Sequence, residues 1–301
     1  MVSPATTARP PLSALLAGLA CGVATVLFWA MGLAAAKHGV THGLGPAEIA
    51  FHRTVWPGLV LLPLVVMRGG FRDLGGVGWG RGIALAIFGG VPFAMLSSVG
   101  FLLVPLGHGG VIQPSTAALS GIVLSAMVLH EAMPAARVAG ALSIVAGLML
   151  IGWEAVATIG SHGIIGDLTC MGAGLAFAVF AMMLRLWRIT PMRSVVIVSV
   201  LSLAYVPVHG ALFGFGRMLA AGWSENLLQI GVQGLLAGTL SAYLFTRTVV
   251  LLGASRAALF PALVPATTLL IGFLALGETP TLFQLAGLAA VGVGFRLAMK
   301  T

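Results

Sequence analysis

Charged residues are scarce in this chain of 301 residues, where Asp, Glu, Lys and Arg together make up 7% of the sequence. A soluble domain carries about 25% charged residues, because its water-facing surface is built from them. A chain with 59% hydrophobic residues and so little charge cannot make such a surface. The composition therefore excludes a soluble protein and indicates that lipid covers most of the folded chain.

Acidic residues are the rarest charged class, and all of them fall near the ends of apolar runs or between them. They are Glu48, Asp73, Glu131, Glu154, Asp167, Glu225 and Glu278. A proton-coupled exporter of cationic drugs needs a carboxylate inside the membrane that proton and drug occupy in turn. None falls in the middle of the first or sixth apolar run, so that mechanism is disfavoured.

Residues for catalysis and metal binding are also sparse. The two cysteines, Cys21 and Cys170, have no Cys or His nearby at a ligand spacing and are interpreted as small core residues. No HExxH motif or glycine-rich phosphate loop is present. The segment 253–256 loosely resembles a serine-protease motif, but no histidine follows it. We therefore expect no catalytic residue, no metal and no cofactor.

Long apolar runs separated by short polar or Gly/Pro breaks are what the sequence does contain. Spanning β-strands alternate over about ten residues, whereas these runs are continuous and long enough for helices of about 20 residues. The sequence predicts an all-α polytopic membrane protein with ten transmembrane helices near 12–37, 46–67, 81–104, 109–130, 134–153, 165–187, 192–215, 227–251, 255–276 and 280–299.

The positive charges indicate the orientation of these helices. Of the 15 Lys and Arg, only Lys37 and Arg217 fall at one face of the ten-helix arrangement, and Arg53 falls within a helix. The others fall at the opposite face, which the positive-inside rule assigns to the cytoplasm together with both termini. The same distribution explains the net charge of +8 without a nucleic-acid partner.

An internal repeat divides the chain. Pro114, Glu131, Gly140 and Gly147 recur 147 residues later, as Pro261, Glu278, Gly287 and Gly294. Each half then holds five helices, and an odd number makes the second half insert upside down relative to the first. Such a 5+5 inverted repeat is typical of transporters, whose binding site lies near the midplane between the halves. A non-transporting membrane scaffold, the rival interpretation, would need neither the repeat nor a buried arginine.

These segments resemble the EamA family of the drug/metabolite transporter superfamily. The resemblance divides the chain into a first repeat at 10–152, a linker at 153–163 and a second repeat at 164–298. It is carried by Gln113-Pro114 through Gly147, by Pro261 through Gly294, and by Arg53. It implies a central cavity lined by helices 1–4 and 6–9, with helices 5 and 10 peripheral, and export of amino acids and other metabolites.

Arg53 is the sharpest candidate for substrate binding. It falls about eight residues into the second helix, where an arginine is costly unless it faces protein or a water-filled cavity. We expect it to receive a substrate carboxylate, together with His52, which also leaves proton coupling open. The competing interpretation is that Arg53 extends toward the membrane surface or ties helices together.

Three prolines are expected to act as hinges, because each removes a backbone hydrogen bond inside a helix: Pro114, Pro261 and Pro265. A static kink is the alternative. Gln113 is a polar candidate beside Pro114, and Trp29, Phe93, Tyr243 and Phe260 are candidates for an aromatic lining, with packing or interfacial anchoring as the alternative for each.

We therefore expect a secondary transporter that exports amino acids or similar small organic metabolites by alternating access. The alternative within transport is efflux of aromatic or drug-like compounds. The expected location is the bacterial inner (plasma) membrane with cytoplasmic termini. The expected partners are a small-molecule substrate and the lipid bilayer, without nucleic acid; a homodimer is left open.

Overall fold

The structure is a computed structural model of the chain. It describes residues 12–67, 71–104, 112–113, 116–117, 119–121, 123–124, 127–128, 135–151, 153, 163–252, 257, 260–267 and 281–299. Pro114, Glu131 and Glu278 lie outside these residues.

The described residues are mostly helical, and no strand occurs among them. The helices are α1 (Leu12–Thr41), α2 (Pro46–Met67), α3 (Trp79–Gly89), α4 (Val91–Leu103), α6 (Ala135–Ile151), α8 (Gly163–Leu186), α9 (Pro191–Leu201), the 3-10 helix η1 (Ser202–Ala204), α10 (Tyr205–Leu212), α11 (Gly216–Gln229), the π-helix η2 (Ile230–Leu240), α12 (Ser241–Leu252), the 3-10 helix η3 (Phe260–Leu263) and α15 (Leu282–Met299).

Six helical stretches within the described ranges are long and apolar enough to cross a membrane. They are Leu12–Thr41, Pro46–Met67, Trp79–Leu103, Ile164–Leu186, Met192–Leu212 and Gly216–Leu252. Shorter apolar helices lie at Val138–Ile151 and Leu282–Gly294. The prediction of an all-α polytopic membrane protein is confirmed, whereas the count of ten helices stays a prediction.

One expected helix, 81–104, is divided in two. Gly90 separates α3 from α4 with φ −101° and ψ −137°, and its N–H donates to the oxygen of Ala86 at 2.9 Å. Pro92 follows in the first turn of α4, a position where a proline loses no helical hydrogen bond. The break therefore lies at Gly90-Val91-Pro92, a signal that the single-helix prediction overlooked.

The segment before residue 227 is the second difference, because the sequence interpretation began a helix only there. In the structure α11 begins at Gly216 and continues through η2 and α12 to Leu252. Gly222 interrupts it, with φ 81° and ψ 168°, a backbone region that suits glycine. The Asn226 amide donates to the oxygens of Met218 at 2.6 Å and Gly222 at 2.7 Å. These bonds bridge the break and explain why the helix continues through a weakly apolar stretch.

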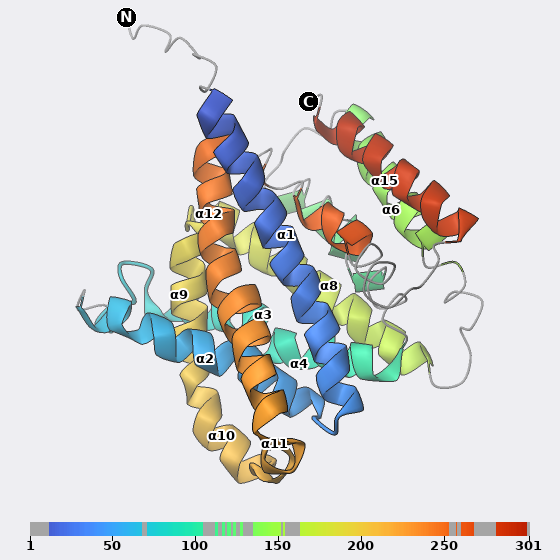
Figure 1. Cartoon of the computed structure of the whole chain (residues 1–301). Helices are drawn as coiled ribbons and strands as arrows, with labels where there is room; N and C mark the ends of the chain where they lie inside the picture. The colour runs from blue at the N-terminus through green and yellow to red at the C-terminus, as the bar shows by residue number, and fades with distance from the viewer. Residues whose placement is uncertain are drawn as a thin grey trace, which may run out of the picture.

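The first helix packs antiparallel along this long stretch, as the blue α1 and orange α12 show (Figure 1). Gly18, near the start of α1, lies against Leu252 at the end of α12. Near the end of α1, the backbone oxygen of Ala35 accepts a hydrogen bond from Gln229 at 2.7 Å. Small residues line the buried face of α1, so the two helices approach closely.

The helices α6 and α15 form a separate antiparallel pair, green and red in Figure 1. A Cβ placed on Gly147 would lie 2.5 Å from the Gly287 oxygen, and one on Gly294 would lie 2.5 Å from the Gly140 oxygen. The partner's residue number falls as the number along α6 rises, so the helices run in opposite directions. Between these contacts, the Ser143 hydroxyl donates to the Ala290 oxygen at 3.0 Å.

Candidate functional site

The helices α2 and η2 meet inside the molecule at a level that includes His52 and Arg53. A Cβ on Gly234 of η2 would lie 2.8 Å from the Cβ of Trp56, and one on Gly238 would lie 2.7 Å from the Cγ of Pro57. The helix η2 is a π-helix of 11 residues. Most π-helices are single turns, and they occur frequently at functional sites. Gly234 and Gly238 therefore let α2 approach η2 closely at the level of His52 and Arg53.

Arg53 is half-buried in a stretch apolar enough to span the membrane. Its guanidinium has no hydrogen bond or ion pair with any residue that the structure describes. The backbone at Arg53 is also unusual, because Pro57 has no N–H to donate to the Arg53 carbonyl four residues earlier. A carbonyl freed in this way inside a membrane must find another partner or line a cavity. At this level α2 therefore offers one strong donor group and one backbone acceptor.

His52 is held by hydrogen bonds on both ring nitrogens. The indole N–H of Trp56 donates to Nδ1 at 3.0 Å, and Nε2 lies 3.1 Å from Oδ1 of Asn226. Since an indole N–H is a donor only, Nδ1 must be the unprotonated nitrogen, and the Nε2–H donates to Asn226. In this arrangement His52 is neutral and links α2 to α11, and neither nitrogen is left for a substrate.

A second buried polar network joins α11 and η2 to α1. Gln229 Nε2 donates to Glu225 Oε1 at 2.8 Å and to the Ala35 oxygen at 2.7 Å, while Gln233 Nε2 donates to the Gly32 oxygen at 2.8 Å. Glu225 Oε2 in turn lies 2.9 Å from His38 Nδ1. The Oε1 atoms of Gln229 and Gln233 are buried and have no donor among the described residues. The network therefore holds two unused acceptors.

This network corrects the placement of one acid. The sequence interpretation left Glu225 just outside the eighth helix, which it began near residue 227, but Glu225 lies within α11 and is 5% exposed. Glu225, Gln229 and Gln233 follow one another at intervals of four residues, which places them on one helix face. That spacing of polar residues was the signal that could have identified them.

The other candidate site residues lie in several places. The Trp29 ring is 5.5 Å from the ring of Phe245, between α1 and α12, and Tyr243 is 50% exposed. Phe93 packs on Phe177 of α8 with ring centroids 6.1 Å apart. Gln113 accepts a hydrogen bond from Ser97 at 2.9 Å. Among the described residues proposed to bind substrate, only His52 and Arg53 lie on the same helix.

The remaining candidates lie near the end of the described chain. Phe260 is buried in a cluster with Val26 and Leu252. Pro261 is the second residue of the 3-10 helix η3, and Pro265 lies in the helical residues that follow. The chain therefore departs from a regular α-helix next to Pro261. The third hinge candidate, Pro114, lies outside the described residues.

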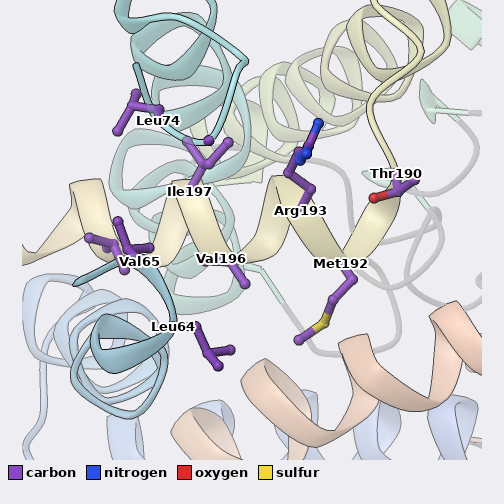
Figure 2. Close-up of a pocket in the computed structure, with 10 residues that line it drawn as sticks. Leu64, Val65, Leu74, Thr190, Met192, Arg193, Val196 and Ile197 are labelled. Atoms are coloured by element: carbon purple, nitrogen blue, oxygen red, sulfur yellow. The ribbon is translucent and has the colours of Figure 1, made fainter. Parts of the chain in front are cut away.

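Neither of two surface pockets formed by described residues includes Arg53 or His52. The first, of about 510 Å³, is mostly apolar and lies between the end of α2 and the start of α9. Figure 2 shows Met192 and Val196 pointing from α9 toward the side of Leu64, and Ile197 toward that of Leu74. The second, of about 450 Å³, lies where α2 begins and includes Glu48 and Arg217. The Arg53 level is not part of either opening.

Known proteins resemble the chain along its length. The model of the EamA-like transporter family matches residues 16–153 and again residues 164–299. An uncharacterized transporter of Archaeoglobus fulgidus is 25% identical over 280 residues, which cover 92% of this chain and 96% of the relative. A solved crystal structure is similar in fold, with a TM-score of 0.70 and 21% identity over 96% of this chain and 97% of that one. The two family matches cover most of the chain, and six described helical stretches are apolar and long enough to cross a membrane. The chain therefore belongs to the EamA-like transporter family and is a multi-pass membrane transporter.

Proposed function

We propose that this transporter is a secondary exporter of amino acids or similar small organic metabolites, working by alternating access between its two halves. The observation that carries the proposal is the unpartnered guanidinium of Arg53 within a membrane-spanning helix. We place both termini in the cytoplasm of a bacterial inner membrane, following the distribution of positive charge.

The cost of burying Arg53 supports a ligand role. Insertion scales assign about 2.5–3.5 kcal/mol to an arginine at the centre of a membrane helix. A structural arginine offsets that cost with an acidic or carbonyl partner, and the described residues supply none to this side chain. A carboxylate is the partner that a planar guanidinium binds best, because it accepts two parallel hydrogen bonds. A substrate carboxylate therefore fits this position.

The buried glutamines support a substrate that also carries hydrogen-bond donors. Gln229 and Gln233 each hold a buried amide oxygen without a donor among the described residues. An ammonium group has three N–H donors, so an amino acid matches both this deficit and the positive charge of Arg53. Acceptors and a cation on neighbouring helices favour a zwitterion over a purely apolar compound.

The arrangement of α6 and α15 supports two halves of opposite orientation. Gly140 and Gly147 of α6 are related by the offset of 147 residues to Gly287 and Gly294 of α15. Helices related by an inverted repeat must run antiparallel across the membrane, and α6 and α15 do. The Ser143–Ala290 hydrogen bond joins positions with the same offset, as expected for contacts near a local two-fold axis.

The contact of α2 with η2 supports a movable interface between the halves. Pro57 removes one backbone hydrogen bond from α2, and η2 replaces α-helical bonds by π-helical ones. Both helices are therefore less rigid at the level of Arg53 than elsewhere. Rearrangement here would open the Arg53 level to one side of the membrane.

A binding experiment tests the proposal. The protein is purified in detergent, and its melting temperature is recorded with amino acids, organic acids, nucleobases and cationic dyes. A ligand that binds only the folded state stabilises it by about 2.7 kcal/mol at a hundredfold Kd. We expect a shift with one carboxylate-bearing class, lost in Arg53→Ala, reduced in Arg53→Lys and kept in the control Arg296→Ala, which changes an exposed arginine of α15.

The outcomes separate the alternatives. Unchanged affinity in a folded Arg53→Ala protein would show the carboxylate role to be wrong. A shift only with aromatic or cationic compounds would favour drug-like efflux, and no shift with any compound would favour a non-transporting scaffold. For a ligand that does bind, uptake into inside-out vesicles, compared with right-side-out vesicles, gives the direction of transport.

A further inference from the structure

Two histidines and a glutamate meet where α1 ends and α11 passes it. His38 lies in the last turn of α1, His42 directly follows that helix and donates its N–H to the His38 oxygen at 3.1 Å, and Glu225 comes from α11. One ligand atom from each of the three lies within 4.8 Å of the others. The sequence interpretation expected no metal site, because no cysteine or histidine falls at a ligand spacing from a cysteine, and it did not weigh this histidine pair.

The carboxylate is already held in place for an ion. Glu225 is 5% exposed, and its Oε1 accepts the hydrogen bond from Gln229 at 2.8 Å. The other oxygen, Oε2, points to His38 Nδ1 at 2.9 Å. Two ligands on a tetrahedral zinc ion lie about 3.3 Å apart at bond lengths of about 2.0–2.1 Å. The pair needs to separate by less than about half an ångström to admit an ion.

The ring of His42 shows the hydrogen bonding of a metal ligand. Its Nδ1 lies 2.9 Å from the backbone oxygen of His38, and a carbonyl can only accept. The proton is therefore on Nδ1, which leaves the lone pair of Nε2 for a metal. Metal-ligating histidines almost always donate their other ring N–H to a carbonyl or carboxylate in this manner.

Access and ligand type decide which ion fits. The His38 side chain is 46% exposed and His42 is exposed, so an ion reaches the cluster from water and keeps a water as its fourth ligand. The two rings stack with centroids 3.9 Å apart, and the exposed His42 ring must turn for both lone pairs to converge. Two imidazoles and one carboxylate suit zinc, nickel or copper, whereas magnesium and calcium require mainly oxygen ligands.

We propose that His38, His42 and Glu225 form a binding site for a divalent transition-metal ion, with zinc as the best fit. The site joins α1, within the first family match, to α11, within the second. A bound ion cross-links the two parts of the transporter at the end where α1 meets α2. Binding replaces the Nδ1 proton of His38 by the metal, so one proton is released or moves to Nε2.

The test uses full-length protein purified without a histidine tag, stripped with EDTA and studied without any substrate. Zinc chloride is titrated by equilibrium dialysis with metal analysis, and the melting temperature is measured in parallel. We expect one zinc ion per chain, a rise in melting temperature, and no rise with magnesium chloride. Cobalt(II) bound in place of zinc gives the visible absorption of a tetrahedral site.

Variants assign the ligands. His42→Ala removes an exposed side chain and keeps the His38–Glu225 pair, so folding is preserved. We expect it and Glu225→Gln to weaken zinc binding by at least about tenfold. The matched control His162→Ala, which removes a histidine from the sequence between the two family matches, keeps full affinity.

The proposal is overturned if the wild-type protein binds no stoichiometric zinc, or if His42→Ala binds zinc as tightly as His162→Ala does. Because no substrate is used, either result leaves the proposed substrate class untouched.

Discussion

Two of the interfaces between the parts of the chain that the family model matches separately are built differently. The α6–α15 interface is formed mainly by glycines and aliphatic residues, with Leu148 and Val291 buried between the helices and one side-chain hydrogen bond, from Ser143. The interface of α1 and α2 with α11 and η2 contains a neutral histidine, two glutamines, a glutamate and a proline. The first interface has two backbones in close contact, and the second has a buried network with unused acceptors.

This difference indicates which interface stays fixed and which one rearranges during transport. Close backbone packing in a membrane is lost outright when either helix moves, since no water replaces the contacts. A polar network has other partners available, because its members can exchange hydrogen bonds with substrate or water. We infer that α6 and α15 hold the halves together while α2 and η2 change.

The largest effect is expected at the α6–α15 interface. Gly147→Leu places a side chain where a Cβ already lies 2.5 Å from the Gly287 oxygen, so the helices must separate. We expect a loss of about 3 kcal/mol, near the upper end for overpacking, measured as a fall in the detergent melting temperature.

Gly292→Leu is the matched control, because Gly292 of α15 is exposed and a Cβ there has no neighbour within 4 Å. Equal melting temperatures for the two variants would contradict the close packing of α6 on α15.

An intermediate effect is expected from Asn226→Ala. This change leaves the Nε2–H of His52 and the oxygens of Met218 and Gly222 without their partner. An unsatisfied buried group costs about 1–3 kcal/mol, so the melting temperature should fall. Trp56→Phe removes one donor from the same network and should cost less. A melting temperature of Asn226→Ala above that of Trp56→Phe would show that the Asn226 bonds are not needed at the Gly222 break.

The smallest effect on stability, and a specific effect on rate, is expected from Pro57→Ala. The new N–H can donate to the Arg53 carbonyl and straighten α2. One net hydrogen bond is worth about 0.5–1.5 kcal/mol, which favours the conformation with a straight α2 by roughly 2- to 13-fold. We expect transport to slow by that factor and substrate affinity to change little. Pro63→Ala changes an exposed proline of the same helix and should transport at the wild-type rate. Equal slowing by both variants would count against a special role for Pro57.

Much of the fold could be predicted because a helix that crosses lipid needs about 20 consecutive apolar residues. The second helix was expected at 46–67 and is Pro46–Met67, since its apolar run is bounded by polar residues on both sides. The break at Gly90 and the early start of α11 at Gly216 were not predicted. The first depends on a glycine and a proline, and the second on Gly222 and the side-chain hydrogen bonds of Asn226. The mean hydropathy of a segment carries no information about either feature.

The candidate site was only partly foreseen for a related reason. Arg53 stands out because a charge in an apolar run is costly wherever it points. Gln229 and Gln233 are less conspicuous, because a glutamine is common in a helix. Their importance comes from hydrogen bonds to the backbone oxygens of α1, which the local sequence does not reveal. Glu225 belongs with His38 through contact between helices far apart in the sequence, and such pairing cannot be inferred from local patterns.

The hydrogen bond from Ser143 to Ala290 also bears on how such a chain can evolve. These positions are separated by the repeat offset and meet where α6 and α15 cross. In a pair of identical, separately made five-helix chains, the residue on that axis would face its own copy, and every mutation there would occur on both sides at once. Within one chain the two positions are inherited separately. One position is a serine that donates a hydrogen bond and the other is an alanine, a difference that two identical subunits could not have.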